Sequence, residues 1–159
     1  MSEMSDKIYF VTGGGTGGHI YPAMAVADEL TARGAKIYYV GNKRNMEFHL
    51  ALNKGYKFLH VGVSGMPRKL SPKFFYWGIR LLRAVMYSVK YIKKYHPTAV
   101  FATGGYVSAP MLFACRITRT PYMMHDCDAM PGLVTRKLSK KAKYVSLAFE
   151  KAKKYIPKI

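Results

Sequence analysis

Gly13-Gly14-Gly15-Thr16-Gly17-Gly18-His19 is the stretch that decides the fold of this chain. A short apolar run over residues 8–11 precedes it, and a run that we expect to be helical from near Pro22 follows it. Glycines between a strand and a helix let backbone N–H groups converge on an anion, because no side chain blocks the approach and the helix dipole favours negative charge. A tight turn alone needs only one glycine of positive φ. The five glycines of this loop therefore predict a site for a phosphate or a sugar diphosphate.

Short apolar runs alternate with longer amphipathic runs along the chain. The apolar runs predict strands at residues 8–12, 36–41, 57–61, 99–103, 122–125 and 144–148. The amphipathic runs predict helices at residues 21–33, 46–54, 72–95, 109–116, 133–140 and 150–155. Strands that are apolar almost throughout are buried on both faces, as in a parallel sheet between helices. We therefore expect an α/β fold with a Rossmann-like parallel sheet and helices on both faces.

Charge and cysteine content narrow the class of protein. The 159 residues include 26 Lys and Arg against 8 Asp and Glu, a net charge of +18, in a chain the size of one domain. Such an excess indicates an anionic partner, which could be nucleic acid, an anionic membrane surface or a phosphorylated substrate. Cys115 and Cys127 lack metal-site spacing and predict free thiols in a reducing compartment. Residues 97–115 carry no Lys, Arg, Asp or Glu, but Pro and Gly interrupt them, so they predict a buried strand, a glycine loop and a helix start rather than a membrane span.

Three loops at the carboxyl ends of the expected strands carry reactive or ligand-binding residues. They are the first glycine loop, the second glycine loop Thr103-Gly104-Gly105-Tyr106-Val107-Ser108, and the polar cluster His125-Asp126-Cys127-Asp128. Ligands of open parallel sheets bind at this edge. We therefore expect the three loops to share one crevice.

Two other nucleotide-binding patterns fit the first glycine loop less well. Gly13, Gly15 and Gly18 match G-x-G-x-x-G, but a nicotinamide site also needs an acidic residue at the end of the second strand. That strand ends in Val40-Gly41-Asn42-Lys43-Arg44, whose basic pair would suit only a 2′-phosphate. A Walker loop needs Gly-Lys-Ser/Thr where this chain has Gly-Gly-His. Both nucleotide interpretations are disfavoured.

The expected helix at residues 72–95 combines apolar and basic faces. Its apolar stripe consists of Phe74, Trp77, Leu81, Val85, Val89 and Ile92, and a second apolar row consists of Phe75, Ile79, Leu82 and Met86. This apolar arc is wider than one sheet contact needs, and cations border it, as in surfaces that bind anionic lipid. The alternative is an ordinary core helix with a solvated lysine face. The membrane hypothesis predicts contacts by Arg68, Lys69, Phe74, Phe75, Trp77, Arg80 and Arg83.

Residues 13–22, 102–110 and 125–133 resemble three signature stretches in the N-terminal half of the MurG family, which belongs to glycosyltransferase family 28. Glu47 and Val63-Ser64-Gly65 extend the resemblance. The family implies a GT-B architecture and inverting transfer of N-acetylglucosamine from UDP-GlcNAc to undecaprenyl-diphosphate-linked muramoyl-pentapeptide, the lipid I to lipid II step of peptidoglycan synthesis. It also implies a peripheral protein on the cytoplasmic face of the cell membrane, with neither metal nor cofactor.

By this resemblance, residues 1–159 form the N-terminal domain that binds acceptor and membrane. The C-terminal donor domain, a necessary partner, is absent from the chain, which we expect to be inactive alone. One alternative is the membrane subunit of a split lipid-linked GlcNAc transferase. Another is a non-catalytic Rossmann module that binds a nucleotide or nucleic acid, although no nucleic-acid motif is present and we expect no such partner.

The resemblance also implies roles for single residues. His19 is the expected general base, because its ordinary pKa lies near neutrality and a helix N-terminus disfavours its protonated form. Asp126 is the other candidate base, and a helix-start hydrogen bond without catalytic duty is the alternative for His19. The expected substrate-binding residues are Thr16, Gly17 and Gly18 for phosphate or donor, Gly104, Gly105 and Tyr106 for the acceptor diphosphate, and Asp128. The usual His-Glu-Gln-Asn of the family is His125-Asp126-Cys127-Asp128 here, which alters the donor side.

Overall fold

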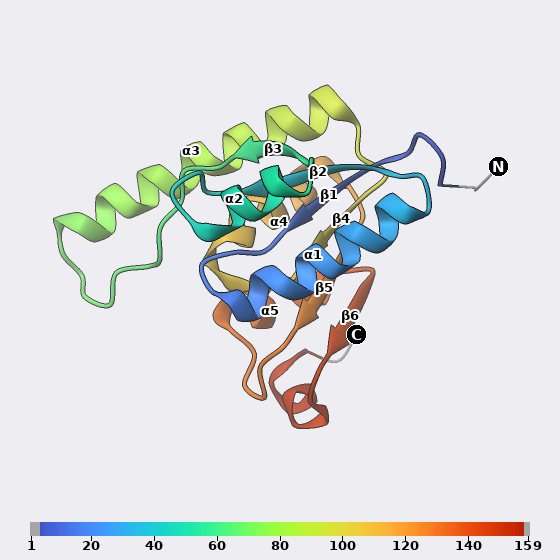
Figure 1. Cartoon of the computed structure of the whole chain (residues 1–159). Helices are drawn as coiled ribbons and strands as arrows, with labels where there is room; N and C mark the ends of the chain where they lie inside the picture. The colour runs from blue at the N-terminus through green and yellow to red at the C-terminus, as the bar shows by residue number, and fades with distance from the viewer. Residues whose placement is uncertain (1–3, 158–159) are drawn as a thin grey trace.

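The computed structural model describes residues 4–157 and contains one sheet of six parallel strands between two layers of helices (Figure 1). The strands are β1 (Ile8–Thr12), β2 (Lys36–Gly41), β3 (Lys57–His60), β4 (Ala99–Ala102), β5 (Tyr122–Asp126) and β6 (Tyr144–Leu147). They lie in the order β3-β2-β1-β4-β5-β6. The predicted parallel α/β fold is confirmed, and each strand ends within one residue of its predicted end.

The helices differ from the prediction mainly at two N-termini. They are α1 (Gly17–Ala32), α2 (Met46–Asn53), α3 (Pro72–Tyr95), α4 (Gly105–Thr118) and α5 (Leu133–Leu138), with 3₁₀ helices η1 (Ser139–Lys141) and η2 (Glu150–Tyr155). The predicted starts of α1 and α4 at residues 21 and 109 are wrong, because both helices begin inside the glycine loops and contain Pro22 and Pro110. The backbone N–H groups of His19 and Ile20 already donate to the Thr16 carbonyl at 3.1 Å. His19 and Gly105 therefore lie in the first turns of helices. Residues 150–155 are 3₁₀ rather than α-helical.

Side chains alternate between two cores because both faces of the sheet are covered. Phe10 of β1 and Tyr38 of β2 point into the core that α3, α4 and α5 cover. Their neighbours Val11 and Tyr39 point into the core that α1 and α2 cover. Residues 97–115 form the end of a loop, β4, the second glycine loop and most of α4, as predicted. Within residues 4–157, no helix has the length and apolar character that crossing a bilayer requires.

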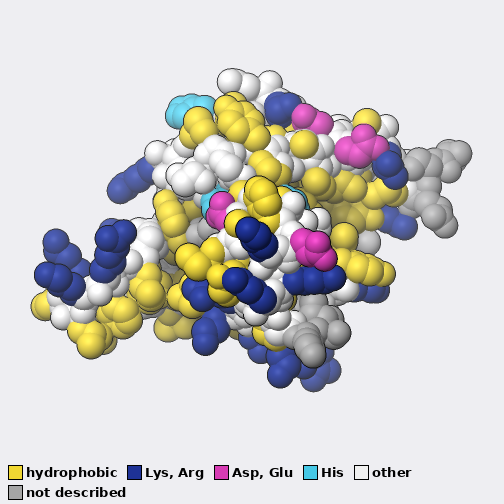
Figure 2. Space-filling view, turned by 90° about the horizontal axis from the view of Figure 1, so that it is seen from below, with side chains coloured by type: hydrophobic (Ala, Val, Ile, Leu, Met, Phe, Trp, Pro, Cys, Tyr) yellow, Lys and Arg dark blue, Asp and Glu magenta, His cyan; other side chains and the backbone are white. Residues whose placement is uncertain are grey.

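The N-terminal part of α3 extends beyond the sheet (Figure 1). Its core-facing residues Ala84, Val85, Ser88 and Ile92 are buried, all in the C-terminal half of the helix. Figure 2 shows hydrophobic side chains along one side of the protruding end and Lys and Arg side chains on the other side. Phe75, in this end, is 69% exposed, and Leu70 in the preceding loop is 90% exposed. The protruding end of α3 is therefore an apolar surface that residues 4–157 leave uncovered.

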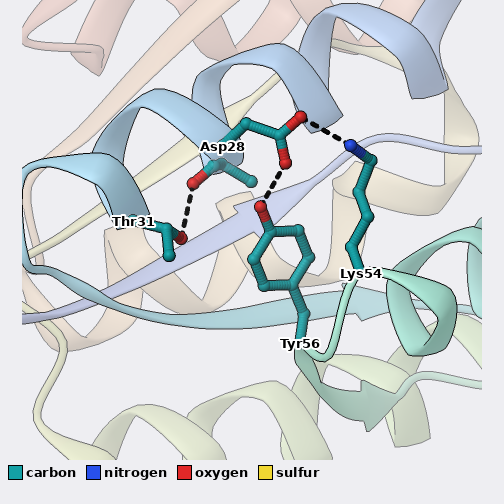
Figure 3. A network of polar contacts seen from close by, with 5 residues as sticks. Asp28, Thr31, Lys54 and Tyr56 are labelled. Atoms are coloured by element: carbon teal, nitrogen blue, oxygen red, sulfur yellow. Dashed lines mark hydrogen bonds and ion pairs between the residues drawn. The ribbon is translucent and has the colours of Figure 1, made fainter.

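A polar cluster fixes the C-terminal half of α1 to the turn before β3 (Figure 3). The Tyr56 hydroxyl donates to Asp28, and the Lys54 ammonium lies 2.6 Å from Asp28 Oδ2. Thr31 donates to the carbonyl of Ala27 in the preceding turn of α1. Burial first, and then the hydrogen bond to Asp28, raises the pKa of Tyr56 to about 12, so its hydroxyl stays a donor at neutral pH. The cluster therefore links the C-terminal half of α1 to the turn between α2 and β3.

Candidate functional site

The two glycine loops lie side by side at the centre of the sheet. One follows β1 and the other follows β4, and these strands are neighbours. The Thr103 N–H donates to the Thr12 carbonyl at 3.0 Å, which continues the strand pairing into the loops. The strand order reverses between β1 and β4, and open parallel sheets bind their ligands outside such a reversal point. The two glycine loops therefore lie where this fold class places its ligand.

Close packing explains the first glycines of the loop after β1. A Cβ on Gly13 would lie 1.9 Å from Thr103 Oγ1, and one on Gly14 would lie 2.5 Å from Glu47 Oε1. Gly15 has a φ of +87°, which favours glycine. Thr16 and Gly18 are exposed, and the N–H groups of Gly17 and Gly18 begin α1 without intrahelical acceptors. The later half of the loop is thus the part whose donors are open to an anion.

His19 is held by the second glycine loop in one tautomer. Its Nδ1 lies 2.8 Å from the Thr103 carbonyl oxygen. A carbonyl only accepts, so Nδ1 carries the hydrogen, and in the neutral ring Nε2 has the free lone pair. The Thr103 hydroxyl in turn donates to the His19 carbonyl at 2.5 Å. The ring is half-buried against the second glycine loop, where a Cβ on Gly105 would lie 3.1 Å from His19 Cδ2. This arrangement leaves a ring nitrogen able to take a proton in the crevice.

Glu47 supports both sides of the crevice, although the sequence reasoning gave it no role. It is 0% exposed, and its Oε1 accepts from the Asn42 N–H and the Asn45 side chain, each at 3.1 Å. Its Oε2 lies 3.5 Å from the Gly15 N–H. The sequence offered only an acidic residue in the first turn of α2, the helix that follows β2, which does not by itself reveal this burial. Glu47 is a positioning residue for the glycine loop.

The loop after β5 completes the crevice. The Cys127 sulfur lies 3.9 Å from His19 Nδ1, and Asp128 is exposed. Asp126 is 1% exposed, and its Oδ1 accepts from the Asp128 N–H at 3.0 Å. Burial first, and then the charges of Asp128 and Asp126, raise the pKa of the Cys127 thiol, which is therefore protonated at pH 7. The structure brings His19 and the third loop together, but it places the Asp126 carboxylate in the interior, behind Gly104.

A cavity of about 720 Å³ adjoins the first glycine loop, between the ends of β2 and β3 and the side of α3. Its cationic lining consists of Lys43, Arg44, Arg80 and Arg83. Tyr106 lines the cavity too, and a Cβ on Gly15 would lie 2.9 Å from its ring, so this side chain lies between the cavity and the first glycine loop. Burial first, and then the charges of Lys43 and Arg44, lower the pKa of His60 in the same lining, so its ring is neutral at pH 7.

The predicted membrane contacts fall into three groups. The first group, Phe75, Arg68 and Lys69, is exposed. Four further apolar side chains in this region are exposed as well: Leu70, Ile79, Leu82 and Met86. Phe74 and Trp77 are half-buried, and the Trp77 indole donates to the Ser64 carbonyl at 3.0 Å. Arg80 and Arg83 line the cavity. The exposed apolar side chains of this surface, Leu70, Phe75, Ile79, Leu82 and Met86, are called the α3 ridge below.

Known proteins resemble this chain in both sequence and fold. Its relatives include proteins with the name UDP-N-acetylglucosamine--N-acetylmuramyl-(pentapeptide) pyrophosphoryl-undecaprenol N-acetylglucosamine transferase. The one from Natranaerobius thermophilus is 39% identical over 150 residues, which cover 93% of this chain and 41% of the relative. The one from Desulforamulus reducens is 40% identical over 147 residues, which cover 91% of this chain and 40% of the relative. The chain thus spans about two fifths of the length of these curated relatives.

Solved structures agree with this likeness. The crystal structure of Acinetobacter baumannii MurG has a TM-score of 0.79 and 29% identity, covering 91% of this chain and 42% of that one. UDP-GlcNAc 2-epimerase from Methanocaldococcus jannaschii, with a TM-score of 0.64 and 15% identity, shares the fold alone. Residues 9–147 match the Glycosyltransferase family 28 N-terminal domain. The chain therefore belongs to glycosyltransferase family 28, as an N-terminal domain of that family.

Proposed function

We propose that this chain is the acceptor-binding half of an inverting transferase. The reaction moves N-acetylglucosamine from UDP-GlcNAc to undecaprenyl-diphosphate-linked muramoyl-pentapeptide, as the names of the relatives indicate for them. The donor half is a second domain, in the same protein or in a separate subunit. Alone, the chain binds acceptor without transferring sugar.

The observation that carries this proposal is the fixed tautomer of His19. An acceptor hydroxyl that attacks the anomeric carbon of the donor must lose its proton as the new C–O bond forms. His19 Nε2 takes that proton, while the bond from the anomeric carbon to UDP breaks and its electron pair leaves with UDP. Attack from the face opposite to UDP inverts the anomeric centre. Thr103 keeps the proton of the neutral ring on Nδ1, so the basic nitrogen is always Nε2.

The remaining crevice residues bind the substrates. The N–H groups of Gly17 and Gly18, with Thr16, lie at the N-terminus of a 16-residue helix and suit a diphosphate. Gly104, Gly105 and Tyr106 shape the acceptor side. Asp128 is exposed in the loop after β5, from which it can reach the donor sugar in the proposed two-half enzyme. A carboxylate there favours hydrogen bonding to sugar hydroxyls rather than to phosphate.

The α3 ridge brings the protein to its lipid-linked substrate. Exposed apolar side chains beside Arg68 and Lys69 suit an anionic membrane surface, with the apolar groups among the lipids and the cations at the headgroups. This surface supports a peripheral protein, and a place on the cytoplasmic face of the cell membrane is part of the same proposal.

The test of the proposal is to supply the missing half. The chain is mixed with, or fused to, the C-terminal portion of the Natranaerobius thermophilus relative, and UDP release is measured with lipid-linked muramoyl-pentapeptide as acceptor. We expect transfer by the combination and none by the chain alone. In the combination, His19→Ala should lower kcat by about 10²–10⁴-fold, the range of general-base catalysis. His49→Ala, at an exposed histidine of α2, is the matched control and should leave kcat unchanged.

Thermal melting of each variant separates lost catalysis from lost folding. Near-normal turnover by a folded His19→Ala variant would remove His19 as the base, and Asp126→Asn would then test the second candidate. Transfer by the chain without any donor half would contradict the division into two halves.

A further inference from the structure

The cations of the cavity beside the glycine loop lack partners of opposite charge. Ion pairs within residues 4–157 lie on α1, at the start of β2 and just before β3, and none includes Lys43, Arg44, Arg80 or Arg83. None of the side chains that line the cavity is Asp or Glu. Like charges gathered around one cavity repel each other, and a bound anion relieves that repulsion. The cavity is therefore built for a negatively charged ligand.

Two elements present these charges from different sides. Lys43 and Arg44 follow β2, and Arg80 and Arg83 lie on one side of α3. With 3.6 residues per turn, Arg80 is in line with Tyr87 and Tyr91, which also line the cavity. The α3 ridge, at positions 75, 79, 82 and 86, follows a different face of the helix. Arg80 thus belongs to the cavity rather than to the apolar surface.

The cavity lies next to the first glycine loop. Tyr106, which lines the cavity, would lie 2.9 Å from a Cβ on Gly15, and its hydroxyl lies 3.5 Å from the Asn45 side chain. A ligand held at His19 would reach Arg80 by passing Tyr106. The only extension that an acceptor has besides its lipid diphosphate is its peptide.

The volume and the lining of the cavity favour the peptide of the acceptor over its diphosphate as the bound group. At about 720 Å³, the cavity is in the range that encloses a whole small-molecule ligand, and a diphosphate alone would leave much of it empty. Its neutral polar lining of Asn42, Asn45 and tyrosine hydroxyls suits peptide amides, and the arginines suit carboxylates, which they bind with two parallel hydrogen bonds. Backbone N–H groups at Gly17 and Gly18 already provide a separate place for the diphosphate.

We propose that this cavity is the subsite for the peptide of the acceptor, and that Arg80 and Arg83, with Lys43 and Arg44, bind the carboxylates of that peptide. The inference rests on the proposed function, since it names the part of the acceptor that the cavity takes. It also reassigns Arg80 and Arg83 from the membrane surface to substrate recognition.

Titration calorimetry of the 159-residue chain tests this assignment. The probes are soluble muramoyl-pentapeptide, the same compound with its carboxylates converted to carboxamides, and inorganic pyrophosphate. We expect the unmodified chain to bind the carboxylate form at least about tenfold more tightly than the carboxamide form, since hydrogen bonds between charged groups are the strong ones. Arg80→Gln with Arg83→Gln should remove this preference without changing the affinity for pyrophosphate. Lys93→Gln with Lys94→Gln, the same loss of charge at exposed positions of α3, should keep the preference.

Four outcomes would overturn the assignment. Equal affinity for the carboxylate and carboxamide forms would show that the cavity does not bind the carboxylates of the peptide. Loss of pyrophosphate affinity alone in the Arg80 and Arg83 variant would show that the cavity is a diphosphate site. A chain that binds neither muramoyl-pentapeptide nor pyrophosphate contradicts the proposed function as well, whereas transfer that proceeds normally and ignores peptide charge contradicts this inference alone. Melting curves confirm folding, which exposed arginines should not affect.

Discussion

Thr103 fixes His19 through two hydrogen bonds in opposite directions. Its carbonyl accepts from the ring, and its hydroxyl donates to the backbone carbonyl. The backbone and the ring of His19 are therefore attached to the loop after β4 rather than to α1 alone. Gly105 completes this arrangement because the absence of a Cβ lets the loop approach the ring. Each of these contacts links residues that are more than 80 positions apart in the sequence.

Gly105→Ala tests that close approach. Gly105 has a φ of +74°, and an added Cβ would lie 3.0 Å from the Gly14 carbonyl oxygen and 3.1 Å from His19 Cδ2. We expect the substitution to lower the free energy of unfolding by about 1–3 kcal/mol, through backbone strain and displacement of the ring. Thermal melting followed by circular dichroism measures this change.

Gly78→Ala is the matched control for that prediction. Gly78 lies inside α3 and has nothing within 4 Å of an added Cβ. Alanine there should raise the free energy of unfolding by about 0.5–1 kcal/mol, because it restricts the unfolded chain and favours helix. A Gly105→Ala variant as stable as the unmodified chain would show that the two loops are looser than their contacts indicate.

At the scale of single residues, the sequence predicted which residues lie in the site better than it predicted their contacts and hydrogen bonds. His19 could be chosen because it ends a glycine loop at a strand end. Its tautomer could not, because the Thr103 carbonyl that sets it lies in the loop after β4, 84 positions away in the sequence. Glu47 gained its role only through burial under Gly14, and a single acidic residue near a helix start carries no such information.

At the scale of elements, α3 has three faces in three different surroundings. One packs on the sheet and α4, one lines the cationic cavity, and one forms the α3 ridge. The sequence predicted its bounds, Pro72–Tyr95, and its excess apolar surface. The starts of α1 and α4 could not be read from the pattern, because glycine and proline usually end helices and here both lie within the first two turns.

Vesicle sedimentation tests the membrane role of the α3 ridge. Phe75→Ser with Leu82→Ser should weaken binding to vesicles that contain phosphatidylglycerol at least about tenfold. The reason is that two apolar side chains no longer leave water for the lipid when the protein binds. The control is Leu52→Ser with Ile117→Ser, two exposed apolar residues on α2 and α4. Unchanged binding by the ridge variant, or equal binding to anionic and neutral vesicles, would contradict the membrane proposal.

At the scale of the whole molecule, the sheet was the most predictable feature. Nearly continuous apolar strands such as residues 36–41 indicate burial on both faces, and that pattern occurs in few folds. The order of the strands could not be derived from periodicity, since it depends on the crossover by α3 from β3 to β4. The cationic cavity was likewise unpredictable, because α3 and the loop after β2 form it together.

The net charge of +18 leaves a nucleic-acid partner as the rival to be tested. We expect the chain to bind duplex DNA only through general charge attraction. Its affinity should then fall by about 10³-fold or more between about 50 and about 200 mM salt, as counterion release requires for several phosphate contacts. Binding of muramoyl-pentapeptide, with few charges, should fall much less. Fluorescence anisotropy at several salt concentrations measures both, and DNA binding that persists at high salt with a sequence preference would favour the nucleic-acid module.

The position of Cys127 allows a chemical label to be attached beside His19. Burial raises the pKa of Cys115, the other cysteine of the chain, to about 12, and its side chain is buried. Cys127 is partly exposed and lies beside the imidazole of His19. A maleimide or another alkylating reagent at mildly alkaline pH should therefore attach at Cys127 alone in the folded protein. A fluorophore placed there would sense arrival of the donor half directly, without any engineered tag.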